Sequence, residues 1–396
     1  MVGNIALNMG ATFPQILKLL QFISCFYGIL TVGVIYLILS KLPLSNFSRL
    51  VAFSTVCFLP RHVYMSAMNS NDAISYFFVS LSIYSLLIVI ERKLPPLILL
   101  VTSIIISVTL FTKYTSYVVL PIVLMSFGLI FYKGLIVPRK KVMVSLILIL
   151  LIPIVLLGVY WASNIKNYGS PLPWNVKRHD PSLTQPRDNR RFDFISFKPW
   201  ETVKTPILVP GKMHSFWTLV YSGMWFDNEP KFLYFLDSNQ DWWKHYYAWL
   251  RGESEFPGDN HSMSHLTKLV GSGLIGLGLL PLLLIVNGFY NYFTGSWKLW
   301  TKAKAGEMEV VRMSIFPTLL LVNAAGIIAL ALRLPVYSAA KASYFLNSLP
   351  AFAVFLSLGL MPCEKNIKLK WTIVIVFGVL FALVTLHILH IFRALV

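Results

Sequence analysis

One carboxylate, Asp72, stands apart from the other acids of the chain. The sequence holds 16 Asp and Glu residues. All the others lie in one long polar segment, except for four in short basic connectors, which are Glu91, Glu307, Glu309 and Glu364. Asp72 instead begins an apolar run. Because a carboxylate near membrane depth is costly, such a residue usually has a function.

The residues before Asp72 favour a helix that begins there. Asn69, Ser70 and Asn71 have side chains that can cap a helix, and the positive end of the helix dipole favours an ionised carboxylate. An ionised carboxylate is what a general base requires. The alternative is that Asp72 is a first-turn acid that only stabilises its own helix.

Isolated cations also lie at the ends of apolar runs. Lys113 occurs in FTKYTSYVVLP and Lys341 in AAKASYFLNSLP. Together they could bind the phosphate of a lipid carrier and stabilise its charge as it leaves. Each lysine taken alone could equally be an anchor that snorkels to the membrane surface. Arg61 and His62 could orient a phosphate or a sugar, or form a plain interfacial pair.

Metal-binding signals are weak. His261 and His265 have the i, i+4 spacing that puts two side chains on one helical face, but no partnered Glu or Cys motif accompanies them. The three cysteines show no paired spacing. We therefore assign no metal ligands and no cofactor, and leave a divalent metal as an open option.

The composition is that of a membrane protein. The 396 residues are 56% hydrophobic and 13% charged. A spanning helix needs about 20 mostly apolar residues, and the chain supplies roughly ten such runs. They are approximately Ile16–Leu42, Phe47–Pro60, Ala73–Ile90, Leu94–Phe111, Tyr117–Tyr132, Val142–Ala162, Leu269–Tyr292, Ser314–Leu332, Tyr344–Met361 and Trp371–Phe392. We expect an all-α, multi-pass membrane protein embedded in the lipid bilayer.

The charge pattern orients these spans. Alternate connectors are rich in Lys and Arg, whereas the short connectors of the other parity hold only Arg61, Lys113, Arg333 and Lys341. The positive-inside rule places the first set in the cytosol and the second set outside, together with the N-terminus. The net charge of +18 is therefore a topology signal, and it does not indicate a nucleic-acid partner.

Three parts follow from this pattern. Residues 1–162 form an N-terminal module of about six spans, 163–268 a large extracytoplasmic loop, and 269–396 a C-terminal module of about four spans. The loop is too long for a plain turn. Within it, Asp241–Arg251 (DWWKHYYAWLR) has an aromatic helical face, which suits either the membrane interface or packing on the protein itself.

Five motifs occur in order along most of the chain. The first is P-x-x-x-Y-x-x-x-x-N-x-N-D-A, from Pro60 to Ala73, and the second is Thr112–Thr115 with Pro121. The others are Asn164–Pro171 (NIKNYGSP), Ser215–Trp217 with Met224–Pro230, and Lys341–Pro350. Together they resemble GT-C-type glycosyltransferases. The similarity is to the bacterial branch related to protein O-mannosyltransferases and the lipid A aminoarabinose transferase.

This resemblance implies an enzyme that takes a sugar from a polyprenyl phosphate, dolichyl or undecaprenyl. The acceptor would be a glycan, lipid or protein on the extracytoplasmic face, and the transfer would invert the anomeric centre. By position, Asp72 matches the acid of the second outer loop of the family. Lys113 and Tyr114 match its phosphate-side motif, and Lys341 and Tyr344 match its late basic motif. Ser343 stands where the family usually has Arg. The plasma membrane of a prokaryote is the implied location.

The sequence also departs from the family at its beginning. Family members start with a cytosolic N-terminus, one further span and an acidic first outer loop, but no acid precedes Asp72 here. We expect either a chain that lacks this first part or a relative without catalytic activity. Such a relative would bind lipid phosphates or act with a partner. A transporter would need polar residues within several spans, which these runs nearly lack.

Overall fold

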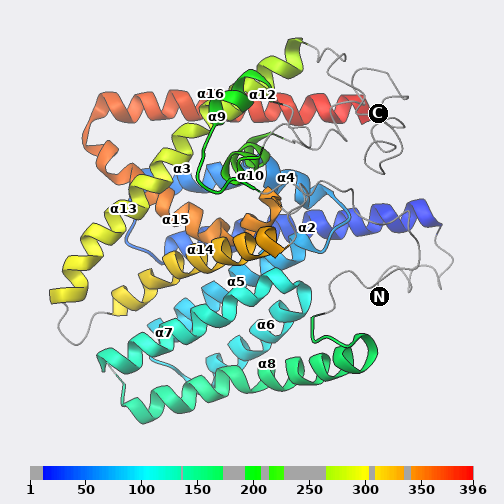
Figure 1. Ribbon diagram of the computed structural model, residues 1–396. Helices are drawn as coiled ribbons and strands as arrows, with labels where there is room; N and C mark the ends of the chain where they lie inside the picture. Colours follow the sequence, from blue (N-terminus) through cyan, green and yellow to red (C-terminus); the bar gives the residue numbers. More distant parts are fainter. Residues whose placement is uncertain are drawn as a thin grey trace.

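The computed structural model describes residues 12–134, 137–172, 192–206, 214–226, 265–302, 308–333 and 340–395. Helices dominate these residues, and the only strand-like contact among them is an isolated bridge between Asp193 and Ser215. Figure 1 shows long helices lying side by side, with α16 at one edge and α8 at the other. The predicted all-α fold is confirmed.

The first half of the described chain contains seven α-helices and a short 3-10 helix. They are α2 (Phe13–Ser40), α3 (Asn46–Cys57), α4 (Pro60–Ala67), α5 (Asp72–Glu91), α6 (Pro96–Thr112), η1 (Tyr114–Val118), α7 (Val119–Lys133) and α8 (Arg139–Tyr168).

The second half begins with two short helices from the large loop and continues with the remaining long helices. They are α9 (Pro199–Lys204), α10 (Phe216–Trp225), α12 (His265–Leu277), α13 (Leu279–Lys302), α14 (Met308–Arg333), η5 (Ala342–Ser348), α15 (Leu349–Leu360), η6 (Met361–Lys365) and α16 (Ile367–Leu395).

Eight of the described segments are long and apolar enough to cross a membrane. The predicted run Leu94–Phe111 is α6, which has 17 residues and is slightly shorter than these eight. The predicted run Phe47–Pro60 is the 12-residue helix α3, which ends at Cys57 and is not among these eight segments, and its last residue, Pro60, begins the separate helix α4. Proline has no N–H to donate, so it suits the first turn of a new helix better than the interior of a continuous one.

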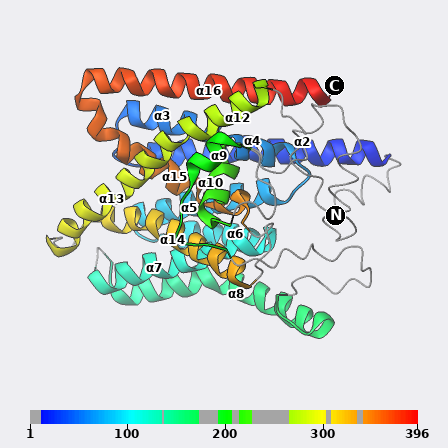
Figure 2. The same cartoon turned by 45° about the horizontal axis from the view of Figure 1, so that its top comes forward.

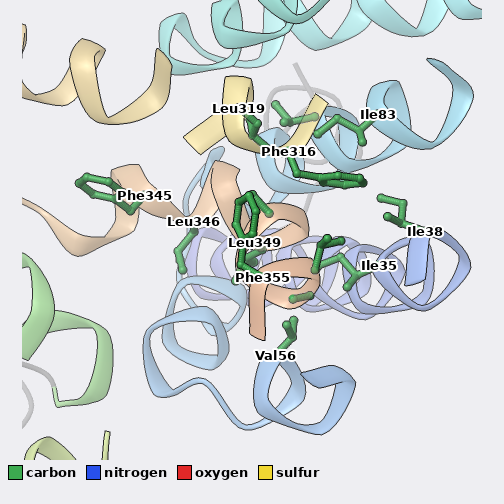
Figure 3. Packing of buried hydrophobic residues seen from close by; sticks show 14 of the residues in the cluster. Ile35, Ile38, Val56, Ile83, Phe316, Leu319, Phe345, Leu346, Leu349 and Phe355 are labelled. Carbon is green, nitrogen blue, oxygen red and sulfur yellow. The ribbon is translucent and has the colours of Figure 1, made fainter. Parts of the chain in front are cut away.

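Two segments form the centre of the bundle. In the Ala342–Lys365 segment, 78% of the residues in the apolar stretch are buried, and in α5 the share is 67%. The share is only 28% in both α8 and α16. Figure 3 shows how side chains converge there, with Ile35 and Ile38 from α2, Phe316 from α14, and Leu346 and Phe355 from the η5–α15 segment. The outer helices therefore turn much of their apolar surface toward lipid, whereas α5 and α15 are enclosed by protein.

Helices α13 and α15 approach each other at two glycines. A Cβ atom added to Gly359 would lie 1.9 Å from the carbonyl oxygen of Leu284, and one added to Gly288 would lie 1.8 Å from that of Phe355. The contact is therefore backbone against backbone. Small residues allow such close packing between membrane helices.

We expect Gly359→Ala to lower stability by about 1–3 kcal/mol, because the two backbones must separate to admit the methyl group. Gly326→Ala on α14 is the matched control, since an added Cβ there meets nothing within 4 Å. The control should keep or slightly raise the melting temperature. Thermal unfolding in one detergent compares them, and equal melting temperatures would contradict the close packing.

Candidate functional site

Asp72 is held by the loop that precedes α5. The hydroxyl of Ser70 donates to Asp72 Oδ2 at 2.5 Å and accepts from the Asp72 backbone N–H at 3.1 Å. Among the three predicted capping residues, it is thus Ser70 that bonds Asp72. The side chain of Asn71, which occupies the N-cap position, donates instead to the carbonyl of Thr112 at 3.0 Å. This bond ties the loop to the end of α6.

Asp72 pairs with Lys113, which lies between α6 and η1. The backbone of Lys113 is extended, with φ −165° and ψ 150°, so the helix ends here and the side chain is presented at the junction. Its ammonium donates to Asp72 Oδ1. The side chain of Lys113 is only 21% exposed and that of Asp72 only 11%. The Asp72–Lys113 ion pair is therefore mostly buried, and each charge offsets the cost of burying the other.

Tyr344, on η5, forms the third side of this arrangement. The ammonium of Lys113 lies over the Tyr344 ring, 5.1 Å from its centroid, which is within the range of a cation–π contact. The carbonyl of Tyr344 accepts from the side-chain amide of Asn323 at 3.2 Å, so η5 is fixed to α14. Asp72, Lys113 and Tyr344 thus come together from three separate elements of the fold.

Arg61 lies near this group on α4. Its side chain is buried, with the residue 8% exposed. On α5, one turn after Asp72, the hydroxyl of Tyr76 donates to the carbonyl of Ser343 at 2.9 Å. Helix α4 also contacts both α5 and η5. Arg61 therefore adds positive charge to the surroundings of the ion pair.

The other two predicted residues have different positions. Lys341 immediately precedes η5, and its carbonyl accepts from the backbone N–H of Tyr344 at 3.2 Å, so it begins the segment that carries Tyr344. Tyr114 is directed toward α8, where its hydroxyl lies 3.4 Å from that of Tyr160. The structure thus brings Lys113 and Tyr344 to Asp72, and connects Tyr114 to a different helix.

Sequence reasoning did not assign the helix that packs beside this group. Every residue of α10 except Trp217 is buried, and the helix contacts both η5 and α4. Figure 2 shows α10 at the centre of the assembly, close to α4 and α9. Its sequence signal is the apolar stretch Phe216–Trp225 inside an otherwise polar loop. The predicted helix Asp241–Arg251 and the side chains of His261 and His265 lie outside the described residues.

Among the residues that the structure describes, the side chains that meet here do not fit a divalent metal. Such an ion prefers several oxygen ligands, usually including carboxylates. The group offers one carboxylate, Asp72, which already pairs with an ammonium. Within the described ranges, no three His, Cys, Asp or Glu side chains gather in a way that could hold a metal ion.

The comparisons with known proteins give one match. Residues 14–168 match the family model of dolichyl-phosphate-mannose-protein mannosyltransferases. The match is less than half of the chain and runs from α2 to α8, so it includes Arg61, Asp72 and Lys113 but not η5. No curated protein and no solved structure matches the chain.

The structure and this match agree on the broad class. Eight candidate spans make the chain an integral membrane protein, and the matched family suggests a membrane glycosyltransferase that uses a polyprenyl-phosphate-linked sugar. The N-terminal part of the chain, which contains the Asp72–Lys113 ion pair, is therefore similar to the dolichyl-phosphate-mannose-protein mannosyltransferases.

Proposed function

We propose that this chain transfers a sugar from a polyprenyl phosphate to an acceptor hydroxyl on the extracytoplasmic face of the membrane. The observation that carries the proposal is the Asp72–Lys113 ion pair, which puts a carboxylate and a cation side by side at the end of a span. The family match covers both residues. A base for the acceptor and a cation for the phosphate are the two groups that this transfer needs.

The phosphate of the donor binds to Lys113 in this proposal. The ammonium has three N–H donors and gives one to Asp72, so it can also reach a phosphate oxygen. Lys341 and Arg61 supply further positive charge from elements that contact the site. Tyr344 remains beside the ammonium as a neutral surface.

Asp72 acts as the base. Its carboxylate accepts the proton of the acceptor hydroxyl while that oxygen forms a bond to the anomeric carbon. The bond from this carbon to the phosphate oxygen breaks on the opposite face, and its electron pair leaves with the polyprenyl phosphate. Because entry and departure occur on opposite faces, the anomeric configuration is inverted.

The ion pair fits this sequence of events electrostatically. The sugar–phosphate diester carries one negative charge, and the departing phosphate monoester gains a second. Lys113 therefore interacts more strongly with the leaving group than with the bound donor, which is the difference that lowers a barrier. When the phosphate draws the ammonium toward itself, the carboxylate of Asp72 becomes available to the acceptor.

The wider setting is also part of the proposal. The distribution of Lys and Arg among the connectors supports an extracytoplasmic position for the Asp72 end of α5, and the motif order supports the bacterial branch related to the lipid A aminoarabinose transferase. We infer a prokaryotic plasma membrane and a glycan, lipid or protein acceptor.

The second candidate is a relative that binds lipid phosphates or acts with a partner without transferring sugar. This candidate is favoured by the ion pair itself, because Lys113 already pairs with Asp72, the one carboxylate among Asp72, Lys113 and Tyr344.

Asp72→Asn should reduce transfer by about a hundredfold or more, the usual contribution of a general base. The rate of transfer is measured with a radiolabelled sugar on a polyprenyl-phosphate donor. The control is Glu201→Gln, which changes an exposed acid paired with Lys198 and should keep wild-type turnover. Binding of the donor should persist in the Asp72→Asn protein. Wild-type turnover in Asp72→Asn would exclude Asp72 as the base, and donor binding without turnover in the wild type would favour the second candidate.

Lys113→Gln should raise the KM for the donor by about tenfold, because a charge-assisted hydrogen bond to the phosphate is lost. Lys198→Gln removes an exposed lysine of the large loop and serves as the control. Initial rates over a range of donor concentrations give both KM values. An unchanged KM in Lys113→Gln would exclude Lys113 as a ligand of the donor phosphate.

A further inference from the structure

A second set of three polar side chains follows Asp72, Lys113 and Tyr344 along the chain. Ser75 follows Asp72 by three residues, Ser116 follows Lys113 by three, and Asn347 follows Tyr344 by three. We call Ser75, Ser116 and Asn347 the polar layer. Ser75 lies one turn after Asp72 on α5 and Asn347 lies one turn after Tyr344 on η5, whereas Ser116 lies on η1, which begins directly after the extended residue Lys113.

The polar layer is joined by its own hydrogen bonds. The hydroxyls of Ser75 and Ser116 are 2.7 Å apart, and the Ser75 hydroxyl donates to Asn347 Oδ1 at 3.1 Å. All three residues are almost completely buried, with exposed fractions of 0%, 0% and 1%. The layer therefore connects three elements: α5, which carries Asp72; η5, which carries Tyr344; and η1, which begins directly after Lys113.

Ser116 carries this connection to Lys113 through the backbone. Its N–H donates to the carbonyl of Lys113 at 3.0 Å, and its hydroxyl lies 3.0 Å from that of Thr112. Lys113 thus sits in a short turn whose two ends are held by Ser116. A shift of Ser116 would move the point from which the lysine side chain extends.

The side chain of Asn347 has a buried polar atom that packing alone does not require. Among the described residues its Nδ2 atom has no hydrogen-bond partner, although the side chain is buried. A buried donor without an acceptor costs free energy comparable to a lost hydrogen bond. A leucine of similar size would avoid this cost, so the contribution of Asn347 lies in the bond that its Oδ1 accepts from Ser75.

We infer that the polar layer positions Lys113 and Tyr344 against Asp72, and that Asn347 is a positioning residue for donor binding. The effect on donor binding rests on the proposed function, whereas the effect on the ion pair does not. When the layer is intact, the Lys113 ammonium stays between the Asp72 carboxylate and the Tyr344 ring. When the layer is broken, η1 and η5 lose their common register with α5 and the ammonium becomes more accessible.

The test measures the accessibility of Lys113 directly. The full-length protein in detergent is treated with sulfosuccinimidyl acetate, and acetylation of Lys113 is followed by peptide mass spectrometry, with exposed Lys198 as the internal reference. The variants are Asn347→Leu and Ser75→Ala. The matched control is Ser82→Ala, which breaks another buried hydroxyl pair of α5, that of Ser82 with Thr109 at 2.8 Å, farther along the helix from the ion pair.

Acetylation of Lys113 should rise by about threefold to tenfold in Asn347→Leu and Ser75→Ala, the range that corresponds to one ordinary hydrogen bond. The melting temperature of Asn347→Leu should stay level or increase, because the unpartnered donor is removed. The double variant should show no more than the larger single effect, since Ser75→Ala already removes the bond that Asn347→Leu removes. Ser82→Ala should leave the acetylation rate at its wild-type value.

An unchanged rate in Asn347→Leu and Ser75→Ala, an equal rise in Ser82→Ala, or full additivity in the double variant would overturn the inference. The KM for the donor, measured on the same proteins, should rise in parallel with acetylation while kcat falls less. If the wild-type protein transfers no sugar, the proposed function fails, and the acetylation rates still decide whether the polar layer holds Lys113.

Discussion

The constraint on which this structure depends is the cost of burying charge beside a membrane. Asp72 and Lys113 are mostly buried, and each is tolerated because the other is present. Removing one partner of such a pair typically costs about 3–5 kcal/mol, because the remaining charge has no compensation. The pair therefore requires the beginning of α5 and the end of α6 to meet. It also requires the backbone between α6 and η1 to leave helical geometry at Lys113.

The surrounding architecture satisfies this requirement with short, tightly wound segments. Both η1 and η5 lead directly into apolar helices, α7 and α15, so a site element and a span follow each other without a flexible connection. The most enclosed of the candidate spans, α5 and the segment that contains α15, carry or adjoin the site, whereas α8 and α16 form the edges (Figure 1). A buried segment of the large loop, α10, packs against η5 and α4. The charged group is therefore supported by the buried centre of the bundle.

The sequence predicted what depends on local composition. Hydrophobic runs of sufficient length indicated the spans, and the isolation of Asp72 among the acids singled it out before any contact was known. The sequence did not predict that Pro60, the last residue of the run Phe47–Pro60, begins the separate helix α4, because a proline after an apolar run can equally lie in a turn. Similarly, it could not show that Tyr114 is directed toward Tyr160 on α8 while its neighbour Lys113 meets Asp72. Such directions depend on backbone geometry and on partners far away in the chain.

In the proposed transfer, Lys113 exchanges Asp72 for the phosphate of the donor. A structure of the full chain with a non-transferable polyprenyl-phosphate sugar analogue tests it most directly, through the distances from Lys113 Nζ to the phosphate oxygens and to the Asp72 carboxylate. The account predicts an Nζ–phosphate oxygen distance of about 2.7–2.9 Å, with the Asp72 carboxylate released toward the acceptor side. A phosphate bound elsewhere, with the Asp72–Lys113 ion pair unchanged, would contradict it.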